Sequence, residues 1–171
     1  MSVSFVSHKQ QWTTREICLT AVMTALVFFM TFVPKIPIPL GYAHLGDAVI
    51  FLLVVMFGRR EGIWAGCLGS ALADFIGGFA LWIGPTLIIK YLMAESFVIL
   101  QSSDEGWLKS PRTFASLVAA CLVMAAGYTI FGAILYDSLT AGLSSLPGLL
   151  LEGAVNVVAF YVMAFAMKNR I

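Results

Sequence analysis

The sequence predicts an all-α membrane protein, a bundle of six transmembrane helices that forms a single integral membrane domain over residues 1–171. Of these 171 residues, 60% are hydrophobic and 11% are charged, and the mean hydropathy is +0.94. Soluble domains carry about 25% charged residues, which excludes a soluble core here. Since a span needs about 20 largely apolar residues, the chain has room for about six spans and for no separate soluble domain.

Caps, prolines and glycine turns bound the predicted spans. Thr13 or Thr14 can cap the first span, and Pro34 ends it. The second span is short, which indicates a tilt, a thin local membrane or a partly buried helix. Residues 58–62 are predicted to form a polar turn, and residues 137–147 a Ser/Gly turn region. The six spans are predicted at residues 17–33, 45–57, 63–77, 85–100, 114–135 and 149–167.

Small residues recur at four-residue intervals along the third span. Gly62, Gly66 and Ser70 form one such series, and Ala73 and Gly77 form another. This spacing lets helices approach closely in lipid, so the span is predicted to pack tightly against a neighbour.

The basic residues predict how the bundle is oriented. With six spans, both termini and the loops after spans two and four share one side, which is predicted to be cytoplasmic because it carries most of the positive charge. The opposite side holds only Lys35, and Lys90 lies inside a span. The proline-rich loop over residues 34–48 is therefore predicted to face outward. The residues on the cytoplasmic side are Lys9, Arg15, Arg59, Arg60, Lys109, Arg112, Lys168 and Arg170.

Polar side chains at membrane depth indicate a binding pocket beneath this loop. An ionisable group there costs at least about 2.5–3.5 kcal/mol, so it usually faces the bundle interior or water. Glu152 and Asn156 are four residues apart and share one face of the sixth span. Most of the polar groups are predicted to lie at one depth, in the outer half of the bundle. The predicted substrate-binding residues are Tyr42, His44, Asp47, Asp74, Trp82, Lys90, Glu152 and Asn156.

Several of these residues also have a purely structural interpretation. Lys90 and Glu152 could contact a ligand or only neutralise one another, and the sequence leaves both open. Asp74 could serve only a crowded helix interface, and His44 could be an ordinary solvated loop residue. Glu95, deeper toward the cytoplasmic side, has no assigned role.

Other function classes lack their signatures in this sequence. It has no HExxH, no GxSxG, no metal-ligand spacing and no P-loop. We therefore expect that the chain is not an enzyme and that it binds neither a cofactor nor a metal. The net charge of +1 indicates no nucleic-acid partner. A pocket on one side without an energy source predicts a substrate-capture subunit that depends on partners. The alternative is a self-sufficient secondary transporter of a small metabolite, acting as an oligomer because the chain is too short for two inverted halves.

The chain resembles the substrate-binding S components (EcfS) of energy-coupling factor (ECF) vitamin transporters, in particular the riboflavin-transporter-type group. The likeness lies in Tyr42–Ala48, in Phe57–Gly62 and in Ile88–Lys90. It implies a multi-pass protein of the bacterial cell membrane whose first outward loop closes over a vitamin. It also implies a complex with a transmembrane coupling subunit (EcfT) and two ATPase subunits (EcfA and EcfA′), which supply the energy. Ala21 and Ala25 match the alanine-spaced surface by which such subunits pack on the coupling subunit.

The sequence indicates the family more closely than it indicates which vitamin is bound. Lys90 offers donors, Glu152 accepts, and Asn156 can do both. With aromatic residues nearby, this set favours pyridoxine or hydroxymethylpyrimidine, then riboflavin, and then pantothenate, whose carboxylate would use Lys90. Whether the coupling subunits are dedicated or shared stays open. The side chains available for stacking are those of Tyr42, His44 and Trp82.

Overall fold

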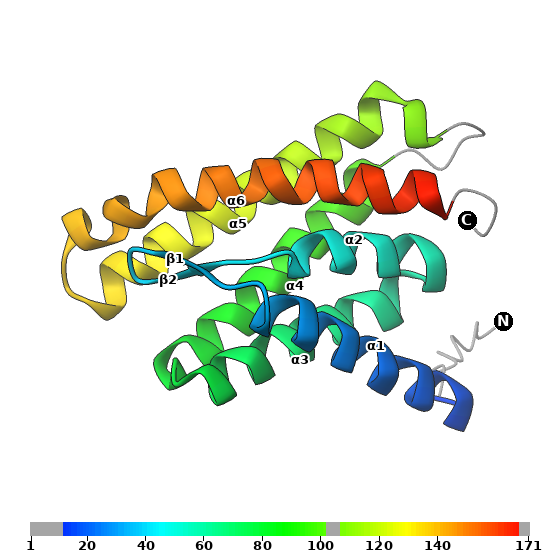
Figure 1. The fold of residues 1–171 in the computed structure, drawn as a ribbon, viewed down its shortest axis with the longest axis horizontal. Helices are drawn as coiled ribbons and strands as arrows, with labels where there is room; N and C mark the ends of the chain where they lie inside the picture. Colours follow the sequence, from blue (N-terminus) through cyan, green and yellow to red (C-terminus); the bar gives the residue numbers. More distant parts are fainter. Residues whose placement is uncertain (1–11, 102–106, 168–171) are drawn as a thin grey trace, which may run out of the picture.

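The computed structural model describes residues 12–101 and 107–167, and these form six α-helices and one short β-hairpin (Figure 1). The predicted helical class is confirmed, with the hairpin and two 3₁₀ turns as additions. The helices are α1 (Thr14–Phe32), α2 (Gly46–Phe57), α3 (Arg59–Gly77), α4 (Ile83–Leu100), α5 (Pro111–Leu135) and α6 (Leu139–Ala166). The strands are β1 (Ile36–Ile38) and β2 (Gly41–Ala43), and the 3₁₀ turns are η1 (Ala80–Trp82) and η2 (Trp107–Lys109).

Four helical segments of the described chain are long and apolar enough to cross a membrane: α1, η1 with α4, α5 and α6. Helix α2 has 12 residues and is about 18 Å long at 1.5 Å per residue, shorter than the roughly 30 Å hydrocarbon core. Its residues from Gly46 to Val54 are all buried. Of the three alternatives for this short segment, the structure therefore supports the buried helix.

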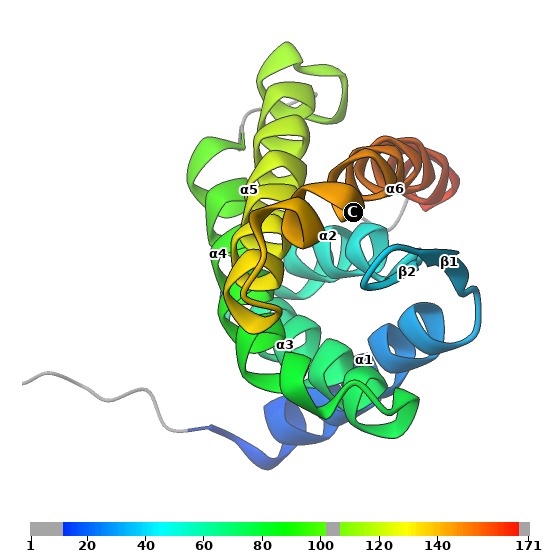
Figure 2. The same cartoon turned by 90° about the vertical axis from the view of Figure 1, so that its left-hand side faces the viewer.

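Helix α2 is the centre of the bundle. It contacts α1, α3, α4 and α6, and in the end view the other helices surround it (Figure 2). Glycines of α3 let that helix approach α2 closely: a Cβ at Gly62 would lie 2.6 Å from Val54 Cα, and one at Gly66 would lie 2.8 Å from Ile50 Cγ2. The tight packing predicted from the small residues of this helix is confirmed.

The predicted polar turn at 58–62 is reduced to one residue. Gly58 has φ of 105° and separates α2 from α3, which begins at Arg59. A positive φ is readily adopted only by glycine, so one glycine reverses the chain and the helix resumes at once.

The predicted turn region at 137–147 was wrong, because α6 begins at Leu139. The side chain of Ser138 caps the helix by accepting the Ala141 N–H at 3.2 Å. Pro147 lies inside the helix, as is tolerated in membrane helices. The hydroxyl of Ser145 hydrogen-bonds back to the carbonyl of Gly142 at 2.8 Å, which satisfies a polar group within the helix itself.

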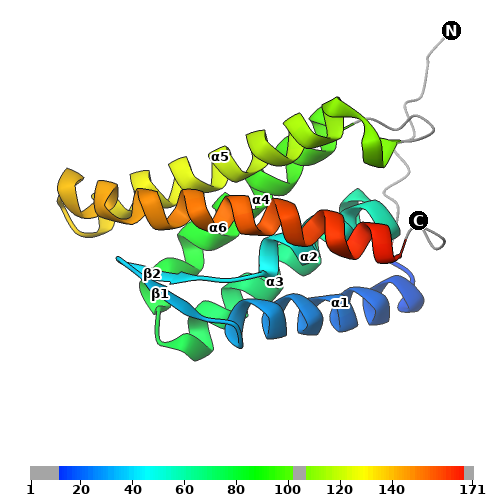
Figure 3. The same ribbon diagram turned by 45° about the horizontal axis from the view of Figure 1, so that its top comes forward.

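The proline-rich segment forms the β-hairpin. Ile36 pairs with Ala43 and Ile38 with Gly41, and Leu40 turns the chain with φ of 63°. The hairpin contacts α6 and lies between α1 and α6 (Figures 1 and 3). It shares one end of the bundle with the α5–α6 turn, whereas the start of α1, the α2–α3 turn and the end of α6 lie at the other end (Figure 1).

Candidate substrate-binding cavity

A cavity lies beneath the hairpin, and its walls come from the hairpin, α1, α3, η1, α4, α5 and α6. Its empty space is about 530 Å³ including the open mouth, and about 50 Å³ of this is accessible to the centre of a water molecule. At roughly 10–15 Å³ per water, that is room for only a few water molecules. A ligand the size of a vitamin therefore requires the hairpin or its neighbours to move.

Five of the eight predicted substrate-binding residues line this cavity, and the other three lie outside its wall. Asp47, Lys90 and Asn156 are the three that do not line it. The lining members are Tyr42, His44, Asp74, Trp82 and Glu152.

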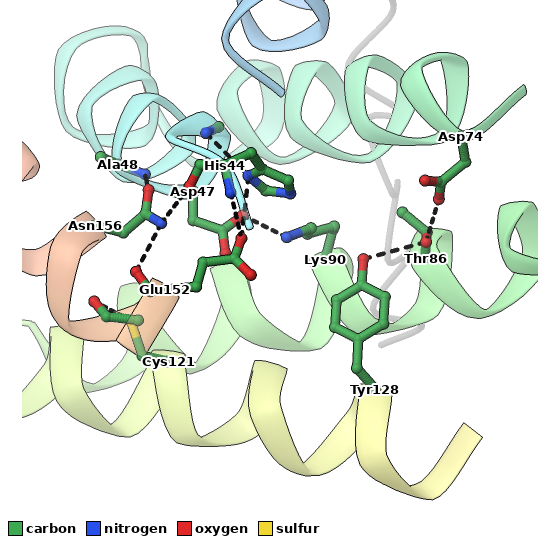
Figure 4. Close-up of polar contacts among 12 residues, drawn as sticks. His44, Asp47, Ala48, Asp74, Thr86, Lys90, Cys121, Tyr128, Glu152 and Asn156 are labelled. Atoms are coloured by element: carbon green, nitrogen blue, oxygen red, sulfur yellow. Dashed lines mark hydrogen bonds and ion pairs between the residues drawn. The ribbon is translucent and has the colours of Figure 1, made fainter. Parts of the chain in front are cut away.

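Glu152 and His44 form one side of the cavity (Figure 4). The Glu152 Oε1 atom lies 3.2 Å from His44 Nδ1 and accepts the backbone N–H of His44 at 3.4 Å. The Gly46 N–H also donates to His44 Nδ1, at 3.1 Å. Burial, together with the nearby Lys90 charge, lowers the pKa of His44 to about 3, so the imidazole is neutral near pH 7. Glu152 therefore has a polar neighbour but no permanently charged one.

Asn156 fixes the end of the hairpin to α6. Its side-chain oxygen accepts the Ala48 N–H at 2.8 Å, and its side-chain nitrogen donates to the carbonyls of His44 and Glu152 at 2.7 and 2.9 Å. These bonds use most of what an amide can form. The role that the structure gives to Asn156 is thus to anchor the chain, while its predicted contact with substrate stays a prediction.

Lys90 is paired with Asp47. The ammonium donates to Asp47 Oδ1, and both side chains are fully buried. The sequence had left two alternatives for Lys90, a ligand contact or neutralisation of Glu152. The structure instead gives it a partner at the start of α2, because the rotation of that helix points Asp47 toward α4.

Asp74 forms the other side of the cavity (Figure 4). It accepts hydrogen bonds from the Tyr42 hydroxyl at 3.3 Å and from the Thr86 hydroxyl at 2.5 Å. Thr86 in turn lies 3.2 Å from the hydroxyl of Tyr128, whose ring packs 5.5 Å from that of Trp82. Hairpin, α3, α4 and α5 are linked through this one carboxylate.

Thr86 and Tyr128 are functional candidates that the sequence did not reveal. A hydroxyl in an apolar helix carries no charge signal, so neither residue stands out. Thr86 does lie four residues before Lys90, on the same face of α4, and that spacing could have identified it.

Glu95, for which the sequence gave no role, pairs with Arg59 at the other end of the bundle. Arg59 Nε and Nη2 donate to Glu95 Oε1 at 3.2 and 2.9 Å, and Nη2 lies 2.8 Å from Oε2. The Arg59 side chain is 61% exposed. This ion pair ties the α2–α3 turn to α4.

The alanines predicted for partner binding lie on the outside of the bundle. Ala21 and Ala25 are exposed, whereas Thr20, Met23, Val27 and Thr31 form the buried face of α1. Ala21 also lines an apolar groove together with Ile17 of α1 and with Trp64 and Leu68 of α3. In this structure the two alanines do not pack inside their own bundle.

Together these features define a class: a multi-pass membrane protein with a cavity that lies beneath a hairpin and carries both polar and apolar side chains on its wall. The model of the ECF-type riboflavin transporter S component family matches residues 11–169, and the chain belongs to that family. The predicted resemblance is confirmed. The family consists of transporter components for vitamin-type substrates and not of enzymes.

Two individual proteins and one solved structure are similar to this chain. An uncharacterised protein of Pyrococcus woesei is 38% identical over 108 residues, which cover 62% of this chain and 70% of that protein. The thiamine precursor transporter HmpT of Lactococcus lactis subsp. cremoris is 29% identical over 136 residues, 75% of each chain. A solved S component of a bacterial ECF transporter has a TM-score of 0.66, with 19% identity over 91% of this chain and 96% of its own. At 19% identity, the similarity to this solved structure shows a shared fold.

Proposed function

We propose that the chain is the high-affinity substrate-capture subunit of an ATP-driven ECF transporter and holds a water-soluble vitamin or vitamin precursor beneath the hairpin. The observation that carries this proposal is the cavity itself, whose wall combines apolar and aromatic side chains with the polar groups of His44, Asp74 and Glu152 and which is covered by the segment that joins α1 and α2. Membership of the S component family and similarity to a thiamine precursor transporter support it. Calorimetric titration of the purified protein with a panel of B vitamins tests it directly.

Among vitamins, pyridoxine and hydroxymethylpyrimidine fit the proposal best, followed by riboflavin. Their aromatic rings suit walls that carry Tyr42, Phe79, Trp82 and Tyr128. Pantothenate is placed last, because the ammonium that would bind its carboxylate is occupied by Asp47.

In this proposal all six helices are embedded in the membrane, with both termini in the cytoplasm and the hairpin facing outward. The start of α1, the α2–α3 turn and the end of α6 share one end of the bundle (Figure 1). The positive charges of the α2–α3 turn, Arg59 and Arg60, lie at that end, as the positive-inside rule requires.

Transport is proposed to need the coupling subunit EcfT and the two ATPases EcfA and EcfA′, with α1 as the docking helix. Ala21 and Ala25 are small and exposed on α1, so a partner helix can approach the backbone closely there. Replacing either alanine with tryptophan should abolish complex assembly and uptake while leaving vitamin affinity unchanged. Ala126→Trp, at an exposed position in the middle of α5, is the matched control and should assemble normally. Loss of vitamin binding in the α1 variants would contradict the docking role.

The competing function is a self-sufficient secondary transporter. The purified chain in liposomes should bind its vitamin but accumulate none under a proton or sodium gradient. Concentrative uptake by the chain alone would replace the capture-subunit proposal with the secondary transporter.

A further inference from the structure

We infer that Glu152 and His44 form a buried proton-binding site, and that the hairpin closes over the cavity only when Glu152 carries a proton. The inference concerns the closure of the hairpin and goes beyond the proposed capture function, because it does not depend on which vitamin is bound. Three observations carry it: the hydrogen bonds of the His44 ring, the balance of buried charge around Glu152, and the position of Glu152 on the cavity wall.

The Nδ1 atom of His44 carries no hydrogen. The Gly46 backbone N–H donates to it at 3.1 Å, and an amide N–H can only donate. An imidazole nitrogen that accepts such a bond is unprotonated, so the ring is neutral and its one hydrogen lies on Nε2. The low pKa of His44, about 3, agrees with this protonation state.

The hydrogen between His44 and Glu152 must therefore come from Glu152. Its Oε1 atom lies 3.2 Å from His44 Nδ1 (Figure 4), and two acceptors at this distance repel one another unless one of them carries a hydrogen. A protonated carboxyl group has one O–H to donate, whereas a carboxylate can only accept. The same oxygen can still accept the backbone N–H of His44, at 3.4 Å. The contact thus forms with a neutral Glu152 and is lost when Glu152 ionises.

The buried charges around Glu152 also balance only when it is protonated. Asp47 and Lys90 form an ion pair of zero net charge, with both side chains fully buried. No lysine or arginine nitrogen of the described residues lies within 4.0 Å of Glu152, whose side chain is 3% exposed. An isolated carboxylate in such surroundings is strongly disfavoured and becomes neutral instead. The titratable and charged groups around the site are Lys35, Tyr42 and His44 of the hairpin segment, Asp47 of α2, Asp74 of α3, Lys90 of α4, and Cys121 and Tyr128 of α5.

The proton site lies where the hairpin meets α6. Glu152 lines the cavity, so water reaches its carboxyl group when the hairpin lifts. A glutamate in water ionises with a pKa of about 4.3, so near pH 7 the open form carries a carboxylate and the closed form a carboxylic acid. Closure therefore takes up one proton. The closed form is fully favoured below about pH 4.3, and the ratio of closed to open protein falls by up to about tenfold with each pH unit above it.

Infrared spectroscopy of the full chain in detergent tests the proton itself, because a protonated carboxyl group has a C=O stretching band that a carboxylate lacks. At pH 6 the wild type should show this band, and Glu152→Gln should lose it. Glu95→Gln is the matched control, since Glu95 is paired with Arg59, and it should lose a carboxylate band instead. If Glu152→Gln loses only a carboxylate band, the inference is overturned.

The linkage to closure is tested with a thiol on the cavity wall. Ser70→Cys, in a chain that also carries Cys18→Ser, places the thiol at a position that is 1% exposed, so maleimide reaches it only when the hairpin lifts. Its labelling rate is divided by that of Gly84→Cys, an open position, which corrects for the effect of pH on thiol reactivity. This ratio should rise at least about tenfold from pH 6 to pH 8.

The same measurement with Glu152→Gln added separates the proton from other effects of pH. The glutamine amide donates to His44 Nδ1 at any pH, so the ratio should stay low at both pH values. A ratio that changes equally with and without Glu152→Gln, or that changes in neither case, overturns the linkage. Neither experiment uses a vitamin, so a failure of every B vitamin to bind in calorimetry would overturn the capture function and leave the proton site standing.

Discussion

Glu95 and Glu152 both lie in helices of the membrane bundle, but only Glu95 has a guanidinium beside it. Arg59 reaches Glu95 from the α2–α3 turn with an Nη2–Oε2 distance of 2.8 Å. Glu152 has the neutral imidazole of His44 as its nearest basic group, 3.2 Å away. Among the described residues, the buried carboxyl group at the end opposite the hairpin therefore has a charged partner, whereas Asp74 and Glu152 at the hairpin end have no lysine or arginine nitrogen within 4.0 Å. This difference points to the hairpin end as the place where a ligand is bound.

The two ends of the hairpin also differ, in how they are attached to the helices. The end that enters α2 is bound through Asn156 and through the Asp47–Lys90 pair. Within the described part of the chain, the bonds of the end that leaves α1 are short-range backbone bonds, from Val33 N to Phe29 O and from Lys35 N to Val33 O, in addition to the ring contacts of Lys35. If the hairpin opens, we expect the α1 end to move and the α2 end to act as the pivot.

The largest expected effect comes from breaking the buried pair at the pivot. Lys90→Met leaves the fully buried Asp47 carboxylate without its cation, so it should lower the free energy of unfolding by about 3–5 kcal/mol. Thermal unfolding of the protein in detergent measures this. The double variant Asp47→Leu, Lys90→Met should recover most of the loss, and a single variant as stable as the wild type would contradict the pairing.

An effect of similar size is expected from Asn156→Leu, which removes the partners of two backbone groups. The change leaves the Ala48 N–H and the His44 carbonyl without partners, at about 1–3 kcal/mol for each unsatisfied group. Hydrogen exchange should therefore increase over residues 44–48 while remaining unchanged in α5. Unchanged exchange at the end of the hairpin would show that Asn156 does not anchor it.

The smallest loss of stability is expected at the end of the bundle opposite the hairpin, where Arg59 pairs with Glu95. Arg59→Met should lower stability less than Lys90→Met does, because the Arg59 side chain is 61% exposed whereas both members of the Lys90–Asp47 pair are fully buried. Vitamin affinity should be unchanged. A marked loss of affinity in this variant would remove the distinction between the two ends.

The position of the cavity could be anticipated from the sequence, because ionisable residues are rare in membrane helices and must face inward. Tyr42, His44, Asp74, Trp82 and Glu152 do line one cavity, although their role in binding substrate stays a prediction. The pairing of the charges could not be anticipated. It depends on how each helix is rotated about its axis, and sequence spacing sets only which residues share a face.

Two local structures were also beyond the reach of the sequence. Ser and Gly residues at 137–147 are typical of turns in water, but in α6 the hydroxyl of Ser145 bonds to its own helix. The hairpin depends on pairing across Pro39 and Leu40, and the positive φ of Leu40 is unusual for a residue with a side chain.

The central claim is that a vitamin binds beneath the hairpin, and cysteine labelling tests it most directly. Gly41→Cys places a thiol on the hairpin at a position where a Cβ meets nothing within 4 Å. The exposed native Cys18 is first replaced by serine. Gly84→Cys, at an equally open position at the start of α4, is the matched control. The vitamin that binds most tightly in calorimetry should slow maleimide labelling of Gly41→Cys at least about tenfold and leave Gly84→Cys unaffected. Equal labelling of Gly41→Cys with and without the bound vitamin would contradict the account.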